Sequence, residues 1–313
     1  MSIKKHYLDK FIRATEQAAI GAYPFIGKGD KIAADQGSVD KMRKELNLIQ
    51  MNGEVVIGEG EMDEAPMLYI GEKIGTKEGQ SLDIALDPLE GTNFVAKNLP
   101  NSFSMLAACE KGNLFSAPDT YMEKIAIGQN LPKNLIDLDN SVEMNMKLLS
   151  EAKKKKISDI TACILKRPRH DKIVRELDKL KVKIQFISDG DVFGAISVAD
   201  PKTNVDVYLG IGGGPEGVLA AAALSCLGGQ IQTRLVLDKN ETLRAKKMGI
   251  TDIKKKYNIE DLIKGDVIFV ASAITDGSII NGVKDLGNKY KVSTFALHKD
   301  ECINKRVNNI HKK

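Results

Sequence analysis

Between residues 159 and 227 the chain repeats one pattern: a short apolar segment, a loop rich in charged residues or glycine, and a helical segment. The apolar segments are DITACIL, VKIQFI and VDVYLGI, and the loops after them begin KRPRHD, SDGD and GGGPEG. Strands that alternate with helices are typical of βαβ units. Because ligands of parallel α/β sheets bind beyond the carboxyl ends of the strands, these loops predict a binding site.

The part of the chain before this repeat is less regular, with short predicted strands that have few helices between them. We therefore expect an α/β protein with a mixed sheet in its N-terminal half and a mostly parallel sheet in its C-terminal half. A lysine- and serine-rich stretch near 150–157 separates the halves 1–155 and 156–313.

Composition limits the class of protein. The 313 residues are 42% hydrophobic and 28% charged, which is ordinary for a globular protein with a core. No apolar run approaches the roughly 20 residues of a membrane span, and the N-terminal segment indicates an amphipathic helix rather than a signal peptide. Lysines are interleaved with acids at a net charge of +4, which favours neither nucleic acid nor membrane as a partner. Four scattered cysteines without a CxxC pair indicate a reduced, cytoplasmic protein.

The stretch LDIALDPLEGTNFVA places two carboxylates at the end of an apolar run. We expect the strand to end at Asp87, because the proline that follows cannot continue it. Glu90 lies three residues on, so both carboxylates can reach one ion or two neighbouring ions. Gly91 lets backbone approach closely, and the Thr92 hydroxyl can orient a water. An ordinary acidic turn with Thr92 as a helix cap explains the same stretch.

Acidic residues follow several of the predicted strands. They are Asp35, Glu59, Glu61, Asp63, Glu64, Asp87, Glu90, Asp189, Asp191 and Glu216. Two like charges about 4 Å apart repel by roughly 4 kcal/mol at an effective dielectric constant near 20, so converging acids require a cation. No histidine or cysteine lies among them, and oxygen ligands favour Mg²⁺ or Mn²⁺. Singly, each acid has an ordinary alternative, such as a solvated loop or, for Asp35, a favourable position near a helix N-terminus.

The basic loop KRPRHD offers two arginines whose forked guanidinium groups match phosphate oxygens. The acids of SDGD can accept hydrogen bonds from sugar hydroxyls. A solvated basic loop and a plain turn remain alternatives. Acids that bind metal, together with a loop that binds phosphate, predict metal-assisted hydrolysis of a sugar phosphate ester.

The loop GIGGGPEG permits a competing hypothesis. Its glycines 212, 214 and 217 match the dinucleotide-binding fingerprint, and Asp238 lies near the expected distance for an acid that binds ribose. Glu216 weakens this interpretation, because it places a negative charge where the pyrophosphate would lie. A non-catalytic nucleotide-binding module is the corresponding alternative function.

Six motifs in order resemble class II fructose-1,6-bisphosphatase: VVIGEGEMDEAPMLYIGEKIG, DIALDPLEGT, APDTYMEKIAIG, KRPRHD, SDGD and GIGGGPEGVLAAAAL. DPLEGT is also similar to a signature of the wider lithium-sensitive sugar and inositol phosphatase superfamily. The resemblance implies a layered α-β-α-β-α sugar-phosphatase fold. It assigns metal binding to the half 1–155 and sugar-phosphate binding to the half 156–313, in one functional unit with the site between them.

The resemblance also implies the roles of individual residues. The metal ligands of a two-metal site for Mn²⁺ or Mg²⁺ would be Asp35, Glu59, Asp87, Glu90 and Glu216. The residues that position and activate the attacking water would be Asp63 and Thr92. The substrate-binding residues would be Glu90, Gly91, Thr92, Tyr121, Arg167, Pro168, Arg169, Asp189, Gly190, Asp191 and Gly213. Asp40, one turn beyond Asp35, offers a second acid in AADQGSVD.

The implied reaction is hydrolysis of the 1-phosphate of fructose 1,6-bisphosphate to fructose 6-phosphate and phosphate, in cytoplasmic gluconeogenesis, by a homo-oligomer. Sedoheptulose 1,7-bisphosphate, or an inositol or sugar monophosphate, is the alternative substrate.

Overall fold

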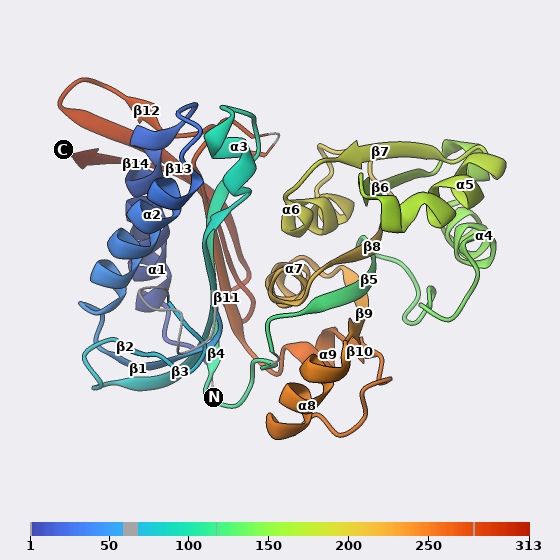
Figure 1. Ribbon diagram of the computed structural model, residues 1–313, viewed down its shortest axis with the longest axis horizontal. Coiled ribbons are helices and arrows are strands. Elements are labelled where there is room, and N and C mark those ends of the chain that lie inside the picture. Colours follow the sequence, from blue (N-terminus) through green and yellow to red (C-terminus); the bar gives the residue numbers. More distant parts are fainter. Residues whose placement is uncertain (1, 59–67, 117, 278) are drawn as a thin grey trace. The chain divides into compact units, whose positions relative to one another are not determined.

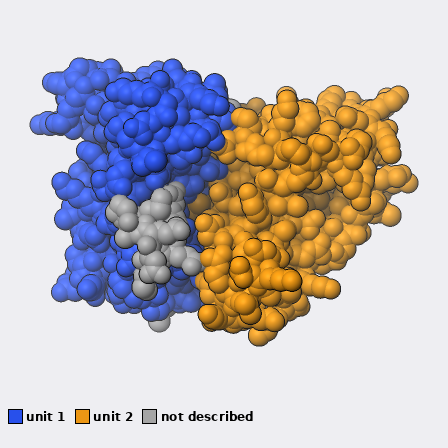
Figure 2. All heavy atoms as spheres, in the orientation of Figure 1, with its two compact units in different colours: residues 1–116, 263–313 blue, residues 117–262 orange. Residues whose placement is uncertain are grey.

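A computed structural model describes residues 2–58, 68–116, 118–277 and 279–313, and the statements that follow concern these residues. The backbone forms two compact units, unit 1 (1–116 and 263–313) and unit 2 (117–262), which Figure 2 colours separately. These bounds differ from the expected halves at two places, because residues 118–155 belong to unit 2 and the C-terminal segment 263–313 returns to unit 1. There β11 (Val267–Ala273) pairs antiparallel with β4 (Phe103–Glu110) along its whole length.

Unit 1 is built on a mixed sheet, as expected for the N-terminal half (Figure 1). Its strand order is β12-β13-β11-β4-β3-β1-β2, with β14 on the outer side of β13. Among the described strands of this first sheet, only β1 and β3 pair in parallel. The other elements of unit 1 are α1 His6–Ala22, η1 Tyr23–Phe25, α2 Lys31–Leu46, β1 Met51–Ile57, β2 Lys73–Ile74, β3 Gln80–Glu90, α3 Thr92–Ala96, β12 Lys284–Asp285, β13 Lys289–His298 and β14 Ile303–Lys312.

Helix α1 packs on this sheet with an apolar stripe that includes Leu8, Phe11 and Ile12, as the sequence pattern predicts. Helices α1 and α2 approach closely at two glycines. A Cβ atom on Gly21 would lie 2.0 Å from the Gly37 carbonyl oxygen, so a side chain there would force the helices apart. None of the described helices combines the length and the apolar content that a membrane span requires.

Unit 2 is built on a second sheet, with strand order β10-β9-β5-β8-β6-β7. Helices α4 and α5 cover one face of it, and α6 and α7 cover the other (Figure 1). The elements of unit 2 are β5 Tyr121–Ile127, α4 Val142–Lys153, η2 Ile157–Asp159, β6 Thr161–Leu165, η3 Pro168–His170, α5 Asp171–Lys179, β7 Lys183–Ile187, α6 Asp191–Ile196, η4 Ser197–Ala199, β8 Val207–Gly213, α7 Gly214–Leu227, β9 Gln230–Val236, α8 Lys239–Lys247, β10 Tyr257–Asn258 and α9 Ile259–Leu262.

The prediction of a mostly parallel second sheet is wrong, because this sheet is mixed. Strands β6, β7 and β8 run parallel, as their alternation with helices indicates. Strand β5, which precedes the regular repeat, inserts between β8 and β9 and is antiparallel to both. Strand β10 is antiparallel to β9 as well. The start of β5 therefore lies beside the end of β8, with Tyr121 opposite Gly213.

Candidate functional site

Strand β3 carries Asp87 and Glu90 at its carboxyl end. The strand continues through Pro88 to Glu90, so the prediction that it ends at Asp87 is wrong. Its pairing with β4 is irregular between Asp87 and Glu90. This irregularity accommodates the proline, which has no N–H to donate, and keeps both acids on ordered strand backbone.

The carboxylates of Asp87 and Glu90 are buried and close together. A carboxylate oxygen of Asp87 lies within 4.8 Å of a carboxylate oxygen of Glu90. The two residues are only 9% and 6% exposed. The Asp87 Oδ1 atom accepts a hydrogen bond from the Leu89 amide at 2.9 Å, and the Ser102 hydroxyl donates to the Glu90 carbonyl at 2.8 Å. Two buried anions at this separation repel strongly, so a divalent cation with oxygen ligands fits this pair.

Gly91 and Thr92 form the turn into α3. Gly91 has a φ of 79° and is the N-cap residue, and Thr92 is the first residue of the helix. Glycine is favoured in this left-handed conformation. A Cβ atom there would also lie 2.7 Å from the Phe94 ring. The alternative in which Thr92 caps the helix is therefore wrong, and the use of its hydroxyl to orient a water stays a prediction.

Helix α2 carries Asp35. The N-cap of this helix is Asp30, whose side chain accepts from the Ala33 amide at 3.0 Å. Asp35 lies more than one turn inside the helix and is half-buried, so the explanation as a favourable N-terminal acid applies to Asp30 instead. The other candidate, Asp40, is exposed and accepts a hydrogen bond from Gln36 at 2.7 Å.

The resemblance implies that Glu59 binds a metal and that Asp63 activates the attacking water. Both residues, together with Glu61 and Glu64, lie outside the described residues.

In unit 2 the basic loop holds Arg169 against the end of β8. The Nε and Nη2 atoms of Arg169 donate to the Ile211 carbonyl at 3.0 and 2.8 Å. Its guanidinium carbon lies 4.9 Å from the centre of the Tyr121 ring, a cation–π arrangement. Tyr121 is 51% exposed and lies opposite Gly213 in the sheet. Three of the predicted substrate-binding residues, Tyr121, Arg169 and Gly213, therefore lie together.

The same loop directs Arg167 toward the end of β7. The Nη1 atom of Arg167 donates to the Ser188 carbonyl at 2.7 Å, and its Nη2 lies 3.9 Å from Oδ1 of Asp189. Gly190, with a φ of 75°, follows as the N-cap of α6. Pro168, between the arginines, begins the 3₁₀ turn η3. The loops KRPRHD and SDGD thus meet at the carboxyl edge of the parallel strands β6 and β7.

His170 connects two of these loops, although the sequence did not mark it as a site residue. Its Nδ1 atom lies 2.7 Å from the Leu165 carbonyl, and its Nε2 accepts from the Ile211 amide at 2.8 Å. The carbonyl requires a proton on Nδ1 and the amide requires a lone pair on Nε2, so the ring is neutral. Burial lowers its pKa below the ordinary value, and the charge of Arg169 adds to this effect.

The glycines of GIGGGPEG make room for carboxylates. A Cβ atom on Gly212 would lie 1.9 Å from Oδ2 of Asp191, and one on Gly213 would lie 1.8 Å from Oε2 of Glu216. The same Asp191 oxygen accepts a hydrogen bond from the Lys124 ammonium at 2.6 Å. Lys124 is a second residue that sequence reasoning missed; the available signal was a lysine inside the apolar strand MEKIAIG.

The chemistry of the Glu216 side chain suits a metal ligand. Its Oε2 atom is buried and has no hydrogen-bond partner within the part of the chain that the structure describes. The pKa of Glu216 is raised to about 7, chiefly by burial and also by the negative Asp191, while the Lys124 ammonium opposes this rise. A buried carboxylate oxygen without a donor is stabilised by a bound cation.

The structure does not support the dinucleotide-binding alternative. In that motif the strand after the helix lies next to the first strand, whereas here β5 separates β9 from β8. The carboxylate of Glu216 packs against Gly213 where a pyrophosphate would approach the helix. Asp238 is the N-cap of α8 and accepts from the Glu241 amide at 2.8 Å in a capping box, so its carboxylate has a structural role.

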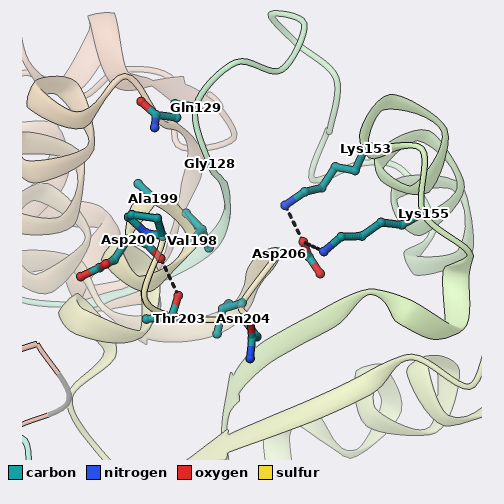
Figure 3. A pocket seen from close by; sticks show the side chains of 12 residues that line it. Gly128, Gln129, Lys153, Lys155, Val198, Ala199, Asp200, Thr203, Asn204 and Asp206 are labelled. Atoms are coloured by element: carbon teal, nitrogen blue, oxygen red, sulfur yellow. Dashed lines mark hydrogen bonds and ion pairs between the residues drawn. The ribbon is translucent and has the colours of Figure 1, made fainter.

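A separate pocket of about 240 Å³ lies at the opposite end of β8 (Figure 3). Asp206 precedes this strand, whereas Gly213 ends it. Figure 3 shows that Lys153 and Lys155 both extend to the Asp206 carboxylate, with Lys155 at 2.7 Å. The lysine- and serine-rich stretch near 150–157 therefore supplies two ammonium groups to a buried carboxylate.

These features define an α/β protein with two mixed sheets and a buried acidic strand end in unit 1. In unit 2 the loops KRPRHD, SDGD and GIGGGPEG form a basic, glycine-rich edge of the sheet, hereafter the ligand edge. Residues 5–311 match the family model described as bacterial fructose-1,6-bisphosphatase, glpX-encoded. The chain therefore belongs to the class II fructose-1,6-bisphosphatase family, and the resemblance seen in its motifs is confirmed.

Curated relatives match almost the whole chain. The "Fructose-1,6-bisphosphatase class 2" of Haemophilus influenzae is 41% identical, over 96% of this chain and 95% of the relative. The "Fructose-1,6-bisphosphatase 1 class 2" of Escherichia coli is 40% identical, over 96% and 94%. A relative from Thermosynechococcus vestitus, 40% identical over 96% and 94%, is named "D-fructose 1,6-bisphosphatase class 2/sedoheptulose 1,7-bisphosphatase".

Among solved structures, an IMPase of Thermotoga maritima matches with a TM-score of 0.33 and 16% identity, over 62% of this chain and 72% of that chain. A similarity at this level carries no argument about the activity or fold of this chain.

Proposed function

We propose that this chain hydrolyses the 1-phosphate of fructose 1,6-bisphosphate to fructose 6-phosphate and phosphate, as a metal-dependent phosphoric monoester hydrolase of gluconeogenesis. The observation that carries the proposal is the close pair of buried carboxylates, Asp87 and Glu90, at a strand end of a chain that belongs to this family. The relatives from Haemophilus influenzae and Escherichia coli are named for this activity, and the match covers nearly their whole length.

The proposed metal ligands would supply oxygen atoms alone. They are Asp35, Glu59, Asp87, Glu90 and Glu216. Such ligands favour Mn²⁺ or Mg²⁺, and two ions would suit five carboxylates. Bound there, a divalent ion would neutralise charge on the phosphoryl oxygens and lower the pKa of a water. The pair in β3 and the buried Glu216 oxygen support this assignment.

The remaining residues would act on the water and the sugar phosphate. Asp63 would accept the proton of the attacking water, and the Thr92 hydroxyl, at the start of α3, would orient that water for in-line attack without a covalent phosphoenzyme. Glu90, Gly91 and Thr92 would lie against the substrate.

The proposed residues of unit 2 would bind the rest of the substrate. Arg167 and Arg169 flank Pro168, and each is fixed by a backbone carbonyl, so each presents N–H groups in a defined orientation to the non-reacting phosphate. The exposed ring of Tyr121 would lie beside them. Asp189, Gly190, Asp191 and Gly213 would contact the sugar. Asp191 is 6% exposed and paired with Lys124, so Asp189 is the more accessible acceptor for a hydroxyl.

Hydrolysis of sedoheptulose 1,7-bisphosphate is the second candidate activity, because the relative from Thermosynechococcus vestitus is named for both bisphosphatases. The two substrates share a 1-phosphate on a ketose and differ by one carbon before the second phosphate. The basic loop would therefore accept either, with the spacing of the second phosphate as the difference.

Further properties of the family are proposed for this chain as well. They are the layered α-β-α-β-α arrangement, action of both units as one functional unit, a cytoplasmic location and a homo-oligomeric state. The two mixed sheets with helices packed on them support the first of these.

The test is a phosphate-release assay with fructose 1,6-bisphosphate, sedoheptulose 1,7-bisphosphate, fructose 1-phosphate, fructose 6-phosphate and inositol 1-phosphate, each with Mn²⁺ and with Mg²⁺. We expect release from the bisphosphates, with fructose 6-phosphate as the product of the first. A preference for inositol 1-phosphate, or no release from any bisphosphate, would contradict the proposal.

A further inference from the structure

A lysine ammonium is buried beneath the ligand edge of unit 2. Lys124, in the middle of β5, is 1% exposed, and lysine is among the residues least often buried. Its Nζ atom donates to Oδ2 of Asp191 and to the carbonyl of Gly213, each at 2.6 Å. The ammonium thus joins the loop after β7 to the end of β8.

The partners of Lys124 hold Asp191 in one position. The Tyr208 hydroxyl donates to the same Asp191 oxygen at 3.3 Å. The backbone of Gly212 packs so closely on this oxygen that a Cβ atom would lie 1.9 Å from it. The Asp191 carboxylate therefore cannot move without disrupting the ion pair, the phenol contact or the strand end. Asp191 is also the first residue of α6, directly after Asp189 and Gly190.

A stabilising role alone does not account for this arrangement. Removing two charges from water is unfavourable, and the attraction within a buried ion pair offsets this penalty only in part, so apolar residues often stabilise a fold equally well. The two contacts of Lys124 instead fix the relative position of two loops. One cation fixes a carboxylate in the SDGD loop and a carbonyl in the glycine loop, and both loops carry proposed substrate-binding residues.

We propose that Lys124 is a positioning residue for sugar-phosphate binding: its ammonium fixes the SDGD and glycine loops relative to each other, so that they meet the substrate already in their binding conformation. The inference rests on the proposed function, because the substrate is the one assigned there. It adds a residue that does not touch the substrate and acts through Asp191 and Gly213. Preorganised loops lose less conformational freedom on binding, so the effect is expected in substrate affinity.

The test compares Lys124→Met with the double variant Lys153→Met/Lys155→Met. The control also removes ammonium groups from a buried carboxylate of unit 2, that of Asp206 at the other end of β8. KM and kcat for fructose 1,6-bisphosphate, and the Kd of fructose 6-phosphate by calorimetry, are measured at a temperature where circular dichroism shows both variants folded. We expect Lys124→Met to raise KM and Kd at least tenfold, and the control to change them less than twofold.

Three outcomes separate the possibilities. If the wild-type protein releases phosphate and folded Lys124→Met keeps KM and Kd within twofold, Lys124 is merely structural and the inference is overturned. If both variants raise KM alike, the effect follows general destabilisation, which also overturns it. If the wild-type protein releases no phosphate from the bisphosphate, the proposed function fails instead, and that result is recognisable without any variant.

If Lys124→Met does not fold, a second comparison of variants tests the inference. Lys124→Met/Asp191→Asn removes both charges, so no ion is left unpaired, and it is compared with Asp191→Asn alone. A positioning residue that acts mainly through Asp191 predicts that the double variant binds fructose 6-phosphate less than tenfold more weakly than the single one, because only the contact with the Gly213 carbonyl is lost in addition. Wild-type affinity in the double variant, or an additional tenfold loss relative to Asp191→Asn, would contradict the inference.

Discussion

The Nε2 atom of His170 accepts a hydrogen bond from the Ile211 amide at 2.8 Å, and this bond ties the basic loop after β6 to the end of β8. Arg169 donates to the carbonyl of the same residue. The peptide groups on both sides of Ile211 are therefore held by neighbouring side chains of a single loop. Two segments 41 residues apart in the sequence form one rigid edge.

The burial of His170 makes stability depend on pH. Burial lowers the pKa of His170 below its ordinary value of 6.5, so the unfolded chain binds this proton more readily than the folded one. Stability that His170 contributes is present above pH 6.5 and is lost as the pH falls from 6.5 toward the lowered pKa of the folded state. Urea unfolding of the wild-type protein between pH 5 and 8 measures the slope.

The variant His170→Ala removes two hydrogen bonds and a buried ring, and we expect it to lower the free energy of unfolding by roughly 2–4 kcal/mol at pH 7.5. Its stability should also vary less between pH 5 and 6.5. His6→Ala, at an exposed position, is the matched control and should leave the free energy of unfolding at pH 7.5 unchanged. An identical pH slope in wild-type protein and His170→Ala would remove His170 from this explanation.

Two neighbouring glycines should respond differently to alanine. Gly213 has a φ of −62°, which alanine adopts readily, and the three atoms nearest to a Cβ there would all belong to the Glu216 carboxylate. Gly213→Ala should therefore change the free energy of unfolding by less than about 1 kcal/mol, because a flexible side chain can move aside. The displaced carboxylate would no longer bind its proposed ion, so we expect kcat/KM to fall at least about tenfold, equivalent to ~1.4 kcal/mol.

In Gly212→Ala the new Cβ would meet Asp191, which Lys124 and Tyr208 hold in place. The variant should lose about 2 kcal/mol of stability or more, because a buried ion pair must be disrupted. Thermal unfolding and phosphate release of both variants test the contrast. Equal stability in the two, or wild-type turnover in Gly213→Ala, would contradict it.

The acidic pair of β3 permits a direct comparison with an acid elsewhere in unit 1. Asp87→Asn and Glu90→Gln retain the shape of the side chain but remove its charge. We expect each to lower kcat at least about 100-fold, equivalent to ~2.7 kcal/mol, and to weaken Mn²⁺ binding in a calorimetric titration. Glu54→Gln, whose carboxylate pairs with Lys111 at 3.3 Å on the surface, should retain kcat and Mn²⁺ affinity. Unchanged Mn²⁺ affinity in both β3 variants would exclude these residues as ligands.

The sequence predicted the acidic strand end because apolar periodicity and an acid after it are local signals. It did not predict that the strand passes through Pro88, since the irregular pairing with β4 that permits this depends on a neighbour in space. The mixed second sheet was missed for a related reason. The alternation of strands and helices describes β6, β7 and β8, whereas the insertion of β5 beside β8 is a long-range choice.

The buried contacts of the ligand edge were also invisible in the sequence. A lysine in MEKIAIG was noticeable, but its partner Asp191 lies 67 residues away and only the fold brings them together. Likewise, the glycines of GIGGGPEG indicated that another group packs closely against the backbone, but the sequence did not identify that group. The structure shows that carboxylates of this chain, and not a nucleotide, occupy the space beside Gly212 and Gly213.

The pocket at the other end of β8 should be structural. Burial opposes ionisation of Asp206, but hydrogen bonds from Lys153, Lys155 and the Thr161 amide outweigh it and hold its pKa below the ordinary value. Asp206→Asn should therefore lower the free energy of unfolding by about 1–3 kcal/mol at pH 7 and leave kcat/KM within twofold. A large loss of activity in folded Asp206→Asn would show that this end of the strand takes part in the reaction.

The central claim is that carboxylates of this chain hold divalent cations that are needed to hydrolyse a sugar bisphosphate. The most direct measurement is phosphate release from fructose 1,6-bisphosphate by wild-type protein that has been treated with a chelator, dialysed, and then titrated with Mn²⁺ or Mg²⁺. We predict no release from the metal-free protein and recovery of turnover as either ion is added. Full turnover after chelation, or no turnover at any concentration of either ion, would contradict the account.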